Sequence, residues 1–373
     1  MKNYGCINRR KNGTYMGRVQ YKGIQKTFYG TSQKSVQNDM NDFVMQAMYG
    51  GLTFQKLTRF GQYCFSYLYT YKYPQIKPSS FDRLESICKC HVSGSEIDIP
   101  IYQLDDMLLQ NYLAEKAKRY SKSTVKKIYD LLKSVLYYAY RKKDIDLDIS
   151  SFLSLPKVEK ETKIIQPYMD EEIEILTTGI EEKIRSKDSK DMRRYRYAPA
   201  FLIVYETGLR AGELLALKKE DIDLENRVIR VHKSLSHVKV RDNPSNTVFI
   251  DVLESPKTDA GTRFVPINNK CYQYIIYLLM DDINSEYLVH NLQGECMKLR
   301  SFQQTYKRIC EELGVTYRGL HALRHTFASV LIRKKVNANV VSKMLGHTSV
   351  KFTYDRYVHP DMEEYKEAVK MLD

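Results

Sequence analysis

The sequence has no long hydrophobic run. None of its 373 residues lies in a stretch that approaches the roughly 20 consecutive apolar residues of a membrane-spanning helix, so we expect no membrane association. The first residues, MKNYGCINRRKNG, are polar, which argues against a secretory signal peptide and favours a cytoplasmic protein. Fixed-period repeats and low-complexity tracts are also absent, and the length predicts two or three domains.

Cysteine is scarce and its count is odd. The seven cysteines lie at positions 6, 64, 88, 90, 271, 296 and 310, a pattern that argues against a disulfide framework. Cys88, Cys90 and His91 lie close together, but no second pair of ligands follows at the spacing of a zinc site. We therefore expect free thiols in a reducing compartment and no bound metal.

Acidic residues are outnumbered by basic ones. The chain has 59 Lys and Arg against 45 Asp and Glu, a formal net charge of +14. This surplus favours a polyanionic partner, most often nucleic acid, although a generally basic cytosolic protein would show the same excess. With 43% hydrophobic residues, the chain can still form packed cores.

Residues 1–50 predict a small sheet followed by one helix. Three short strands are expected between residues 4 and 29, because an Asn-Gly pair typical of a tight hairpin is followed by alternating apolar and polar residues. A helix should begin at about Ser32. The uncovered face of the sheet would carry Arg18 and Lys26, which could contact DNA or could simply keep a small module soluble.

Residues 54–156 predict an independent bundle of four helices. Ser123 is the expected N-cap of the fourth helix. Lysines are dense on the last two helices, where Lys122 and Lys126 are candidates for contacts with the DNA backbone; the alternative is an ordinary solvated face. Residues 142–167 contain two prolines and alternating charge, and most of this segment is expected to be an interdomain linker.

The segment from residue 165 onward begins with a helix for which Asp170 is the expected N-cap. Gly208 is well placed to end a second, strongly apolar helix. Arg210 follows directly, and an arginine beside buried chain needs an anionic partner. That partner could be Glu213, one turn later, or a bound phosphate gripped by the guanidinium group.

Strands are expected around residues 227–233 and 247–253. The stretch ESPKTDAGTRFVPI then predicts a turn between strands, with Lys257 near its tip. A lone lysine in a loop is normally solvated, so Lys257 becomes a candidate catalytic residue only in combination with other site residues.

Histidines gather near the C-terminus. His321 and Arg324 are three residues apart and therefore share one face of a helix, whereas the adjacent His325 is expected to point elsewhere. His347 comes just after a helix-ending glycine and ten residues before Tyr357.

Five blocks in this order resemble the tyrosine recombinases, the phage-integrase family: TGLRAGELLAL, SPKTDAGTRFVPI, HALRHTF, LGH and YVH. The resemblance covers residues 165–373 and implies a DNA breaking-rejoining catalytic fold. Residues 54–156 are similar to the SAM-like helical core-binding domain of that family. Residues 1–50, through GTYMGRVQYKG, resemble the arm-type DNA-binding domain of phage and conjugative-transposon integrases. We therefore expect a multidomain, mainly α protein with small β-sheets.

The resemblance also implies a role for each matching cation. Arg210 and Arg324 would clamp the non-bridging oxygens of the scissile phosphate. His321 would hydrogen-bond the phosphate and shuttle the tyrosine proton, and His347 would donate to another phosphate oxygen. Lys257 would protonate the departing 5′ oxygen.

Tyr357 would be the nucleophile in this scheme and would form a 3′-phosphotyrosyl link, while Glu213 would orient the cluster. The family interval between the LGH histidine and the tyrosine is about nine residues and here it is ten, which leaves Tyr354 as an alternative. A phenol has a pKa of about 10 and is a weak nucleophile at neutral pH. The surrounding cations would lower this pKa and favour the phenolate.

The expected protein is a site-specific DNA recombinase, an integrase of a mobile element. It would act on double-stranded DNA at core-type and arm-type sites, as a homotetramer that joins two duplexes through a Holliday junction. A DNA-bending accessory protein or an excision factor is a further possible partner. No cofactor is expected, because the phosphotyrosyl bond conserves the energy for religation and no Walker-type glycine loop is present. The alternatives are a type IB topoisomerase-like enzyme and a catalytically dead DNA-binding regulator.

Overall fold

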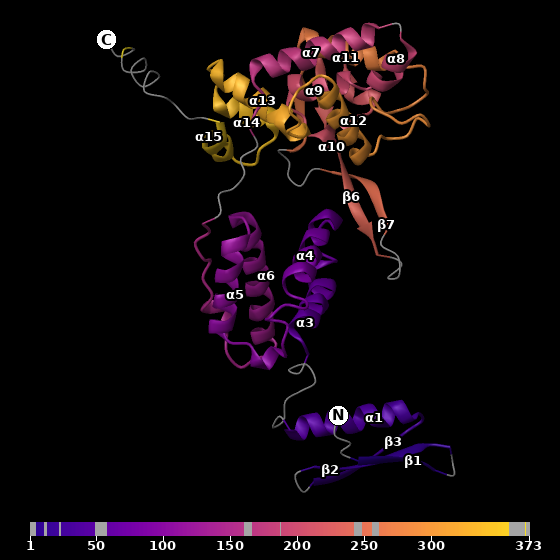
Figure 1. The fold of residues 1–373 in the computed structure, drawn as a ribbon, viewed down its shortest axis with the longest axis vertical. Helices are drawn as coiled ribbons and strands as arrows, with labels where there is room; N and C mark the ends of the chain where they lie inside the picture. Colours follow the sequence, from indigo (N-terminus) through magenta and orange to yellow (C-terminus); the bar gives the residue numbers. More distant parts are fainter. Residues whose placement is uncertain are drawn as a thin grey trace. The chain divides into compact units, whose positions relative to one another are not determined.

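The computed structural model describes residues 5–10, 13–21, 24–48, 58–159, 166–186, 188–241, 248–255, 261–357 and 370. The chain divides into two compact units, residues 1–162 and 163–373 (Figure 1). The first unit contains a small sheet with one helix and, further along the chain, a helical bundle. The candidate reactive residues all belong to the second unit.

The N-terminal module is a three-stranded antiparallel sheet followed by one helix, as expected. The strands β1 (Gly5–Arg9), β2 (Tyr15–Tyr21) and β3 (Ile24–Gly30) lie in this order, and α1 (Gln33–Met48) packs on one face of the sheet. A Cβ atom at Gly17 would lie 2.2 Å from the sulfur of Met40. Glycine at this position therefore lets α1 approach the middle strand closely.

The register of the sheet separates the two basic candidates of this module. Arg18 pairs with Thr27 and is exposed, while its neighbour Val19 is buried under α1. Lys26 lies opposite Val19, so its side chain leaves the sheet on the side of the helix, where its ammonium group lies 5.4 Å from the ring centre of Phe43. The expectation that Lys26 shares the uncovered face with Arg18 is wrong, because paired residues in a sheet point to the same face.

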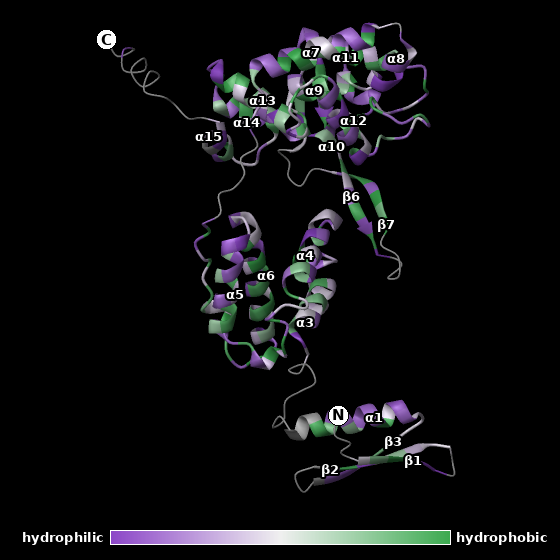
Figure 2. Cartoon of the chain, in the orientation of Figure 1, coloured by the Kyte–Doolittle hydropathy of each residue, from purple (hydrophilic) through white to green (hydrophobic). Residues whose placement is uncertain are grey.

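The helical bundle confirms the expectation of four helices, and its core is continuous. Figure 2 shows hydrophobic residues along α6, of which Val125, Ile128, Leu132 and Val135 are fully buried. The helices are α3 (Phe60–Tyr67, prolonged by the short π-helix η1, Leu68–Lys72), α4 (Pro78–His91), α5 (Asp106–Arg119) and α6 (Lys122–Arg141).

Two details of the bundle differ from expectation. Helix α6 begins at Lys122, so the N-cap position belongs to Ser121 and not to Ser123. The segment after α6 is not mainly a linker, because Ile145, Ile149 and Leu153 are buried in the bundle core. Two aspartates lie between Ile145 and Ile149, and two serines follow Ile149, so polar residues interrupt the apolar ones of this segment in the sequence.

The second unit is mainly helical and is built around α9 (Pro199–Thr207), which packs against α11 (Asn269–Leu279) and α13 (Leu320–Arg333). Helix α9 is buried over most of its length, because nearly all of its residues are apolar. The other helices are α7 (Asp170–Arg185), α8 (Ser189–Tyr195), α10 (Ala211–Leu215), α12 (Leu299–Glu312), α14 (Ala338–Leu345) and α15 (Val350–Tyr357).

Two small antiparallel sheets complete this unit. One has the order β4-β5-β8, and the other is the β6–β7 hairpin. Strands were expected at 227–233 and 247–253, and the structure places β5 and β7 there. The bounds are β4 (Ile222–Asp223), β5 (Val228–Val231), β6 (Ser234–Val240), β7 (Val248–Glu254) and β8 (Arg263–Pro266).

The start of α7 differs by one residue from the expected one. Met169 occupies the N-cap position, and its backbone N–H donates to the carboxylate of Glu172 at 3.0 Å. Asp170 is the first helical residue and pairs with Arg333 at 2.6 Å. Over the part of the chain that the structure describes, no helix is both long and apolar enough to cross a membrane.

Candidate active site

The turn after α9 positions the first arginine of the site. Gly208 ends the helix with φ of 67°, as expected, and a Cβ atom there would lie 2.5 Å from the ring of Phe327 and 2.8 Å from Leu345. Glycine therefore supplies the left-handed conformation and also leaves room for α13 and α14. Arg210 follows in an extended conformation at the N-cap position of α10.

Glu213 is a buried carboxylate that accepts hydrogen bonds from two arginines and lies 3.9 Å from a third, Arg324. Its Oε1 accepts from Nη1 of Arg210 at 2.6 Å, and its Oε2 accepts from Nη2 of Arg263 at 2.9 Å. The Oε2 atom also accepts from the backbone N–H of Arg210 at 2.9 Å. Burial alone would raise the pKa of Glu213, but Arg263 and then Arg210 outweigh it and lower this pKa to about 2. The carboxylate is therefore ionised at neutral pH and holds both guanidinium groups.

Arg263 is a site residue that the sequence analysis missed. Besides Glu213, it contacts the end of α14, where its Nε donates to the carbonyl of Met344 at 2.7 Å. Its side chain is only 7% exposed. A signal was present, because Arg263 shares the buried phase of the strand β8 with Val265, and a charged residue on that phase requires a partner.

Removing the Glu213 carboxylate should destabilise the protein strongly. In Glu213→Ala, the buried Arg263 loses its counter-ion, and we expect the free energy of unfolding to fall by about 3–5 kcal/mol. Urea unfolding followed by circular dichroism measures this loss. Asp170→Asn, which removes the exposed carboxylate paired with Arg333, is the matched control and should change stability little. Equal effects of the two substitutions would contradict the structural role of Glu213.

Arg324 is the most deeply buried cation of the site, with a side chain 2% exposed. It donates from Nη1 to the carbonyl of Gly208 at 2.7 Å and from Nη2 to that of Leu345 at 2.6 Å. These carbonyls lie at the C-terminal ends of α9 and α14, which a cation complements. One guanidinium group therefore fixes two helix ends beside the cavity.

Three histidines and Tyr357 complete a cavity of about 270 Å³. His325 was expected to point away, but its Nδ1 lies within hydrogen-bond distance of the Tyr357 hydroxyl. The expectation was wrong because residues 321, 324 and 325 are spaced i, i+3 and i+4, which places all three on one helical face. The lining residues are Arg210, His321, Arg324, His325, Gly346, His347, Thr348, Phe352 and Tyr357.

The last helix places the two candidate tyrosines differently. Tyr357 lines the cavity, whereas Tyr354 is 48% exposed and does not. His347 follows Gly346, which ends α14 with φ of 65° as expected, and its Nδ1 lies 2.9 Å from the hydroxyl oxygen of Thr353 on α15. The turn after α14 and the helix α15 are thus held together beside the arginines.

The remaining candidates lie outside the described residues or belong to the first unit. Lys257 lies outside the described residues, between the end of β7 and the start of β8. In the first unit, Lys122 is exposed at the start of α6, and Lys126 is exposed and paired with Asp130 at 2.8 Å. Among the described residues, no group of three or more His, Cys, Asp or Glu is arranged to hold a metal ion.

The cations of the cavity disfavour protonated histidine. Burial, and then neighbouring charges, lower the pKa of His325 to about 3 and that of His347 to about 4. Burial, and then the charges of Arg324 and Arg210, also lower the pKa of His321, although this residue is exposed and solvent weakens the effect. All three rings are therefore neutral at pH 7 in the free protein. Burial raises the pKa of Tyr357, which Arg324 and Arg356 offset only in part.

These shifts predict a protein that loses stability in mild acid. The unfolded chain takes up protons on its histidines below pH 6.5, whereas folded His325 and His347 do so only near pH 3 to 4. Stability should therefore fall as the pH decreases through this window, which urea unfolding between pH 8 and pH 5 measures. His325→Gln should flatten the dependence, while His237→Gln, at an exposed histidine on β6, should not. An unchanged slope in His325→Gln would contradict the assignment.

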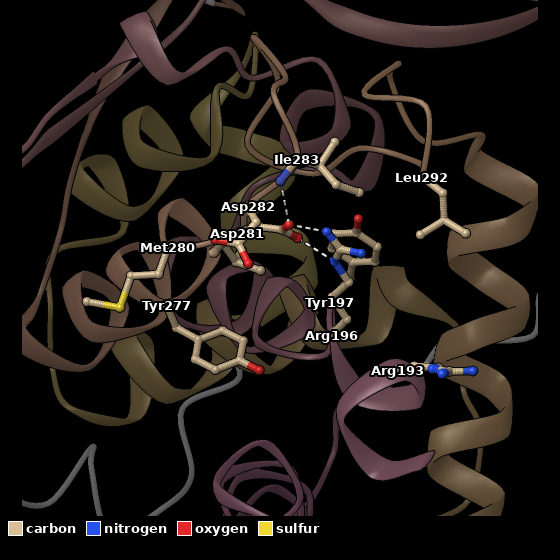
Figure 3. A pocket seen from close by; sticks show the side chains of 10 residues that line it. Arg193, Arg196, Tyr197, Tyr277, Met280, Asp281, Asp282, Ile283 and Leu292 are labelled. Carbon is tan, nitrogen blue, oxygen red and sulfur yellow. Dashed lines mark hydrogen bonds and ion pairs between the residues drawn. The ribbon is translucent and has the colours of Figure 1, made fainter. Parts of the chain in front are cut away.

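A second and larger cavity, of about 700 Å³, lies elsewhere in the same unit (Figure 3). Arg196 and Asp281 form an ion pair on its wall, and the backbone N–H of Ile283 donates to Asp281 at 3.1 Å. Tyr277 and Met280 supply apolar surface. None of the residues around the Tyr357 hydroxyl lines this cavity, so size does not identify the reactive site here.

Comparison with known proteins agrees with this geometry. The family model described as "Phage integrase family" matches residues 169–364, just over half of the chain. A tyrosine recombinase XerC-like protein of Caldanaerobacter subterraneus subsp. tengcongensis is 28% identical over 98% of this chain and 94% of its own. The transposase from transposon Tn916 of Enterococcus faecalis is 25% identical over 53% of this chain and 51% of its own.

Solved structures show the same fold. The Tn1549 transposon integrase in complex with transposon right end DNA gives a TM-score of 0.65 at 21% identity, over 84% of this chain and 99% of that one. A lambda integrase tetramer bound to a Holliday junction gives a TM-score of 0.57 at 15% identity, over 95% and 96%. With the matching family model and the cavity around Tyr357, these likenesses show that the chain belongs to the phage integrase family of tyrosine recombinases.

Proposed function

We propose that this protein is a site-specific DNA recombinase that cuts and rejoins DNA through Tyr357, as the integrase of a mobile element. The observation that carries this proposal is the position of the Tyr357 hydroxyl, which lies in one cavity with Arg210, Arg324 and His347. A phosphodiester in this cavity would meet a nucleophile and several donors to its oxygens. Such preorganised donors are the means by which enzymes stabilise the charge of a pentacoordinate phosphorus.

The two arginines are suited to hold the scissile phosphate in different ways. Arg324 is fixed by two carbonyl groups and is almost completely buried, so its donors need no reorganisation. Arg210 is held by Glu213 but has a side chain 40% exposed, which leaves part of its guanidinium group free for an incoming anion. His347, which is neutral in the free protein, would donate to another phosphate oxygen.

The reaction would proceed by exchange of oxygens on phosphorus. The Tyr357 oxygen forms a bond to phosphorus, the bond to the 5′ oxygen breaks, and Lys257 is the proposed donor of a proton to that oxygen. The product is a 3′-phosphotyrosyl link with a free 5′ hydroxyl group. Attack by a 5′ hydroxyl from a partner strand reverses the sequence, and no nucleotide is consumed because the bond energy is conserved.

The other domains would supply binding and assembly. We propose residues 1–50 as the arm-type and residues 54–156 as the core-type DNA-binding domain, with Arg18, Lys122 and Lys126 as phosphate contacts. Support comes from the basic net charge of +14 and from the related proteins that were solved on transposon DNA and on a Holliday junction. We further propose that the protein acts as a homotetramer on two duplexes, with a DNA-bending or excision factor as partner. Residues 361–373 would form a contact between protomers; apart from Lys370, they lie outside the described residues.

A trapping experiment tests the proposed function. The full chain is incubated with nicked duplexes of randomised central sequence, in which the cleaved fragment diffuses away and the covalent adduct accumulates. Sequencing the attached DNA should then reveal a discrete site. The absence of an adduct would support a catalytically dead regulator, whereas relaxation of any supercoiled DNA without sequence preference would support a topoisomerase-like enzyme.

Binding should depend steeply on salt. Each neutralised phosphate releases counter-ions, so we expect the association constant for DNA to fall about 10³-fold or more between 50 and 200 mM salt if six or more phosphates are contacted. Fluorescence anisotropy with a labelled duplex measures this slope. Lys122→Ala should reduce the slope by about one unit, whereas Lys307→Ala, an exposed lysine on α12 that is paired with Glu311, serves as the matched control.

A further inference from the structure

The hydroxyl of the proposed nucleophile is held by a histidine outside the set that the family resemblance implies. Nδ1 of His325 lies within hydrogen-bond distance of the Tyr357 hydroxyl, and the two ring centres are 5.6 Å apart. His325 is only 5% exposed and lies on the same face of α13 as His321, whose ring meets it edge-on at 4.8 Å. The phenol hydroxyl of Tyr357 is therefore in direct contact with the ring of His325.

The surroundings of His325 determine when it can hold a proton. Its own helix contributes His321 and Arg324, α15 contributes Arg356, and the turn after α14 contributes His347. Each of these groups opposes a positive charge on the His325 ring, and burial does so as well. In the free protein the ring is therefore neutral, and its Nδ1 can accept a hydrogen bond from the phenol but holds a proton poorly.

A phosphodiester would change this balance. Its negative charge in the cavity, close to the two arginines, would offset the repulsion that His325 feels from the cations. Charge also accumulates on phosphorus as the new bond forms, which favours a cation next to the attacking oxygen still further. Burial of the site strengthens both effects, because the local dielectric is lower than that of water.

We propose that His325 accepts the proton of Tyr357 during cleavage, and does so effectively only when a DNA phosphodiester occupies the cavity. This inference rests on the proposed function. The O–H bond of Tyr357 breaks, the proton passes to Nδ1 of His325, and the oxygen forms its bond to phosphorus while the bond to the 5′ oxygen breaks. The 5′ oxygen takes its proton from the proposed acid, Lys257. In religation, Lys257 takes the proton of the attacking 5′ hydroxyl group and His325 returns its proton to the phenol, so both residues regain their starting protonation states.

One consequence is protection of the nucleophile. Without DNA, the phenol remains protonated because its partner cannot hold the proton and burial keeps the pKa of Tyr357 above its ordinary value. The binding of the correct phosphate would thus let His325 hold the proton of the phenol and would also supply the phosphorus that Tyr357 attacks. His321 would then serve as a donor to the phosphate, a role that its exposed position at the cavity permits.

The test compares His325→Asn with His321→Asn on the DNA site recovered by trapping. His325→Asn should lower the single-turnover cleavage rate by about 10²–10⁴-fold without weakening DNA binding. Incorporation of 3,5-difluorotyrosine at position 357, whose phenol loses its proton more readily, should recover at least about tenfold of this loss, since less help from a base is needed. The same replacement should not rescue His321→Asn. Equal rescue of both variants, or cleavage by His325→Asn at the normal rate, would overturn the proposal.

A second measurement leaves His325 intact. In the full chain bound to an intact duplex, the ¹³Cζ signal of Tyr357 is identified by its loss in Tyr357→Phe. This signal should shift between pH 8 and pH 5 as His325 gains a proton, and a signal that stays constant would overturn the proposal even if the asparagine variant failed to fold. Absence of the adduct from the unsubstituted protein, with normal DNA binding, would instead contradict the proposed function itself.

Discussion

Replacing Tyr357 by phenylalanine should abolish the covalent adduct and leave DNA binding intact. The substitution removes one oxygen atom, so the ring still fills its place in the cavity while phosphorus has no nucleophile. Loss of a covalent nucleophile is among the largest effects known in enzymes, and we expect the rate of adduct formation to fall about 10⁴-fold or more. Denaturing gel electrophoresis of protein with a labelled nicked duplex measures the adduct, and fluorescence anisotropy measures binding.

Tyr354→Phe is the matched control for this experiment. Tyr354 lies one helical turn earlier on α15, is 48% exposed and does not line the cavity, so the adduct should form at the normal rate. An adduct that survives in Tyr357→Phe and disappears in Tyr354→Phe would reassign the nucleophile. It would also require a different position of α15 in the complex with DNA.

Replacing Arg210 by alanine should slow cleavage by about 10²–10³-fold, the usual cost of removing one preorganised donor from a developing anion. Its side chain is 40% exposed, so stability should change much less than for Glu213→Ala. Arg210→Lys keeps the charge but loses the planar fork, and we expect it to recover only part of the rate. Single-turnover cleavage at saturating protein separates this effect from weaker binding.

Arg185→Ala is the matched control for Arg210→Ala, because this arginine on α7 is 77% exposed and pairs with Glu181 at 3.6 Å. It should cleave DNA at the normal rate. If Arg210→Ala also cleaved at the normal rate, Arg210 would serve only to hold Glu213, and the clamp on the phosphate would have to come from Arg324 alone. If Arg210→Lys cleaved at the normal rate, positive charge and not fork geometry would be what the reaction needs.

Local patterns in the sequence were sufficient to predict most of the helices and strands. Strand alternation after the Asn-Gly turn predicted β2, and helical spacing predicted α1 and the bundle helices. Glycines with positive φ were predicted as helix ends at Gly208 and Gly346, because that conformation is difficult for other residues. Each of these features depends on residues that are neighbours along the chain.

The errors concern side-chain direction and long-range contact. Lys26 was placed on the wrong face because the phase of β3 depends on its pairing with β2. His325 was excluded from the site because only its position next to Arg324 was considered, and not its spacing from His321. Arg263 was missed because its partners, Glu213 and the carbonyl of Met344, lie 50 and 81 residues away. The packing of Ile149 on the bundle depends likewise on distant helices.

The two carbonyl contacts of Arg324 limit how this protein can lose its activity in evolution. A lineage that retained only DNA binding could discard the Tyr357 hydroxyl with little harm to the fold, because within the described part of the chain it forms a hydrogen bond with one side chain, that of His325. It could not discard Arg324 as easily, since two helix termini would lose their ligand together. Inactive descendants should therefore keep this arginine long after the tyrosine has disappeared.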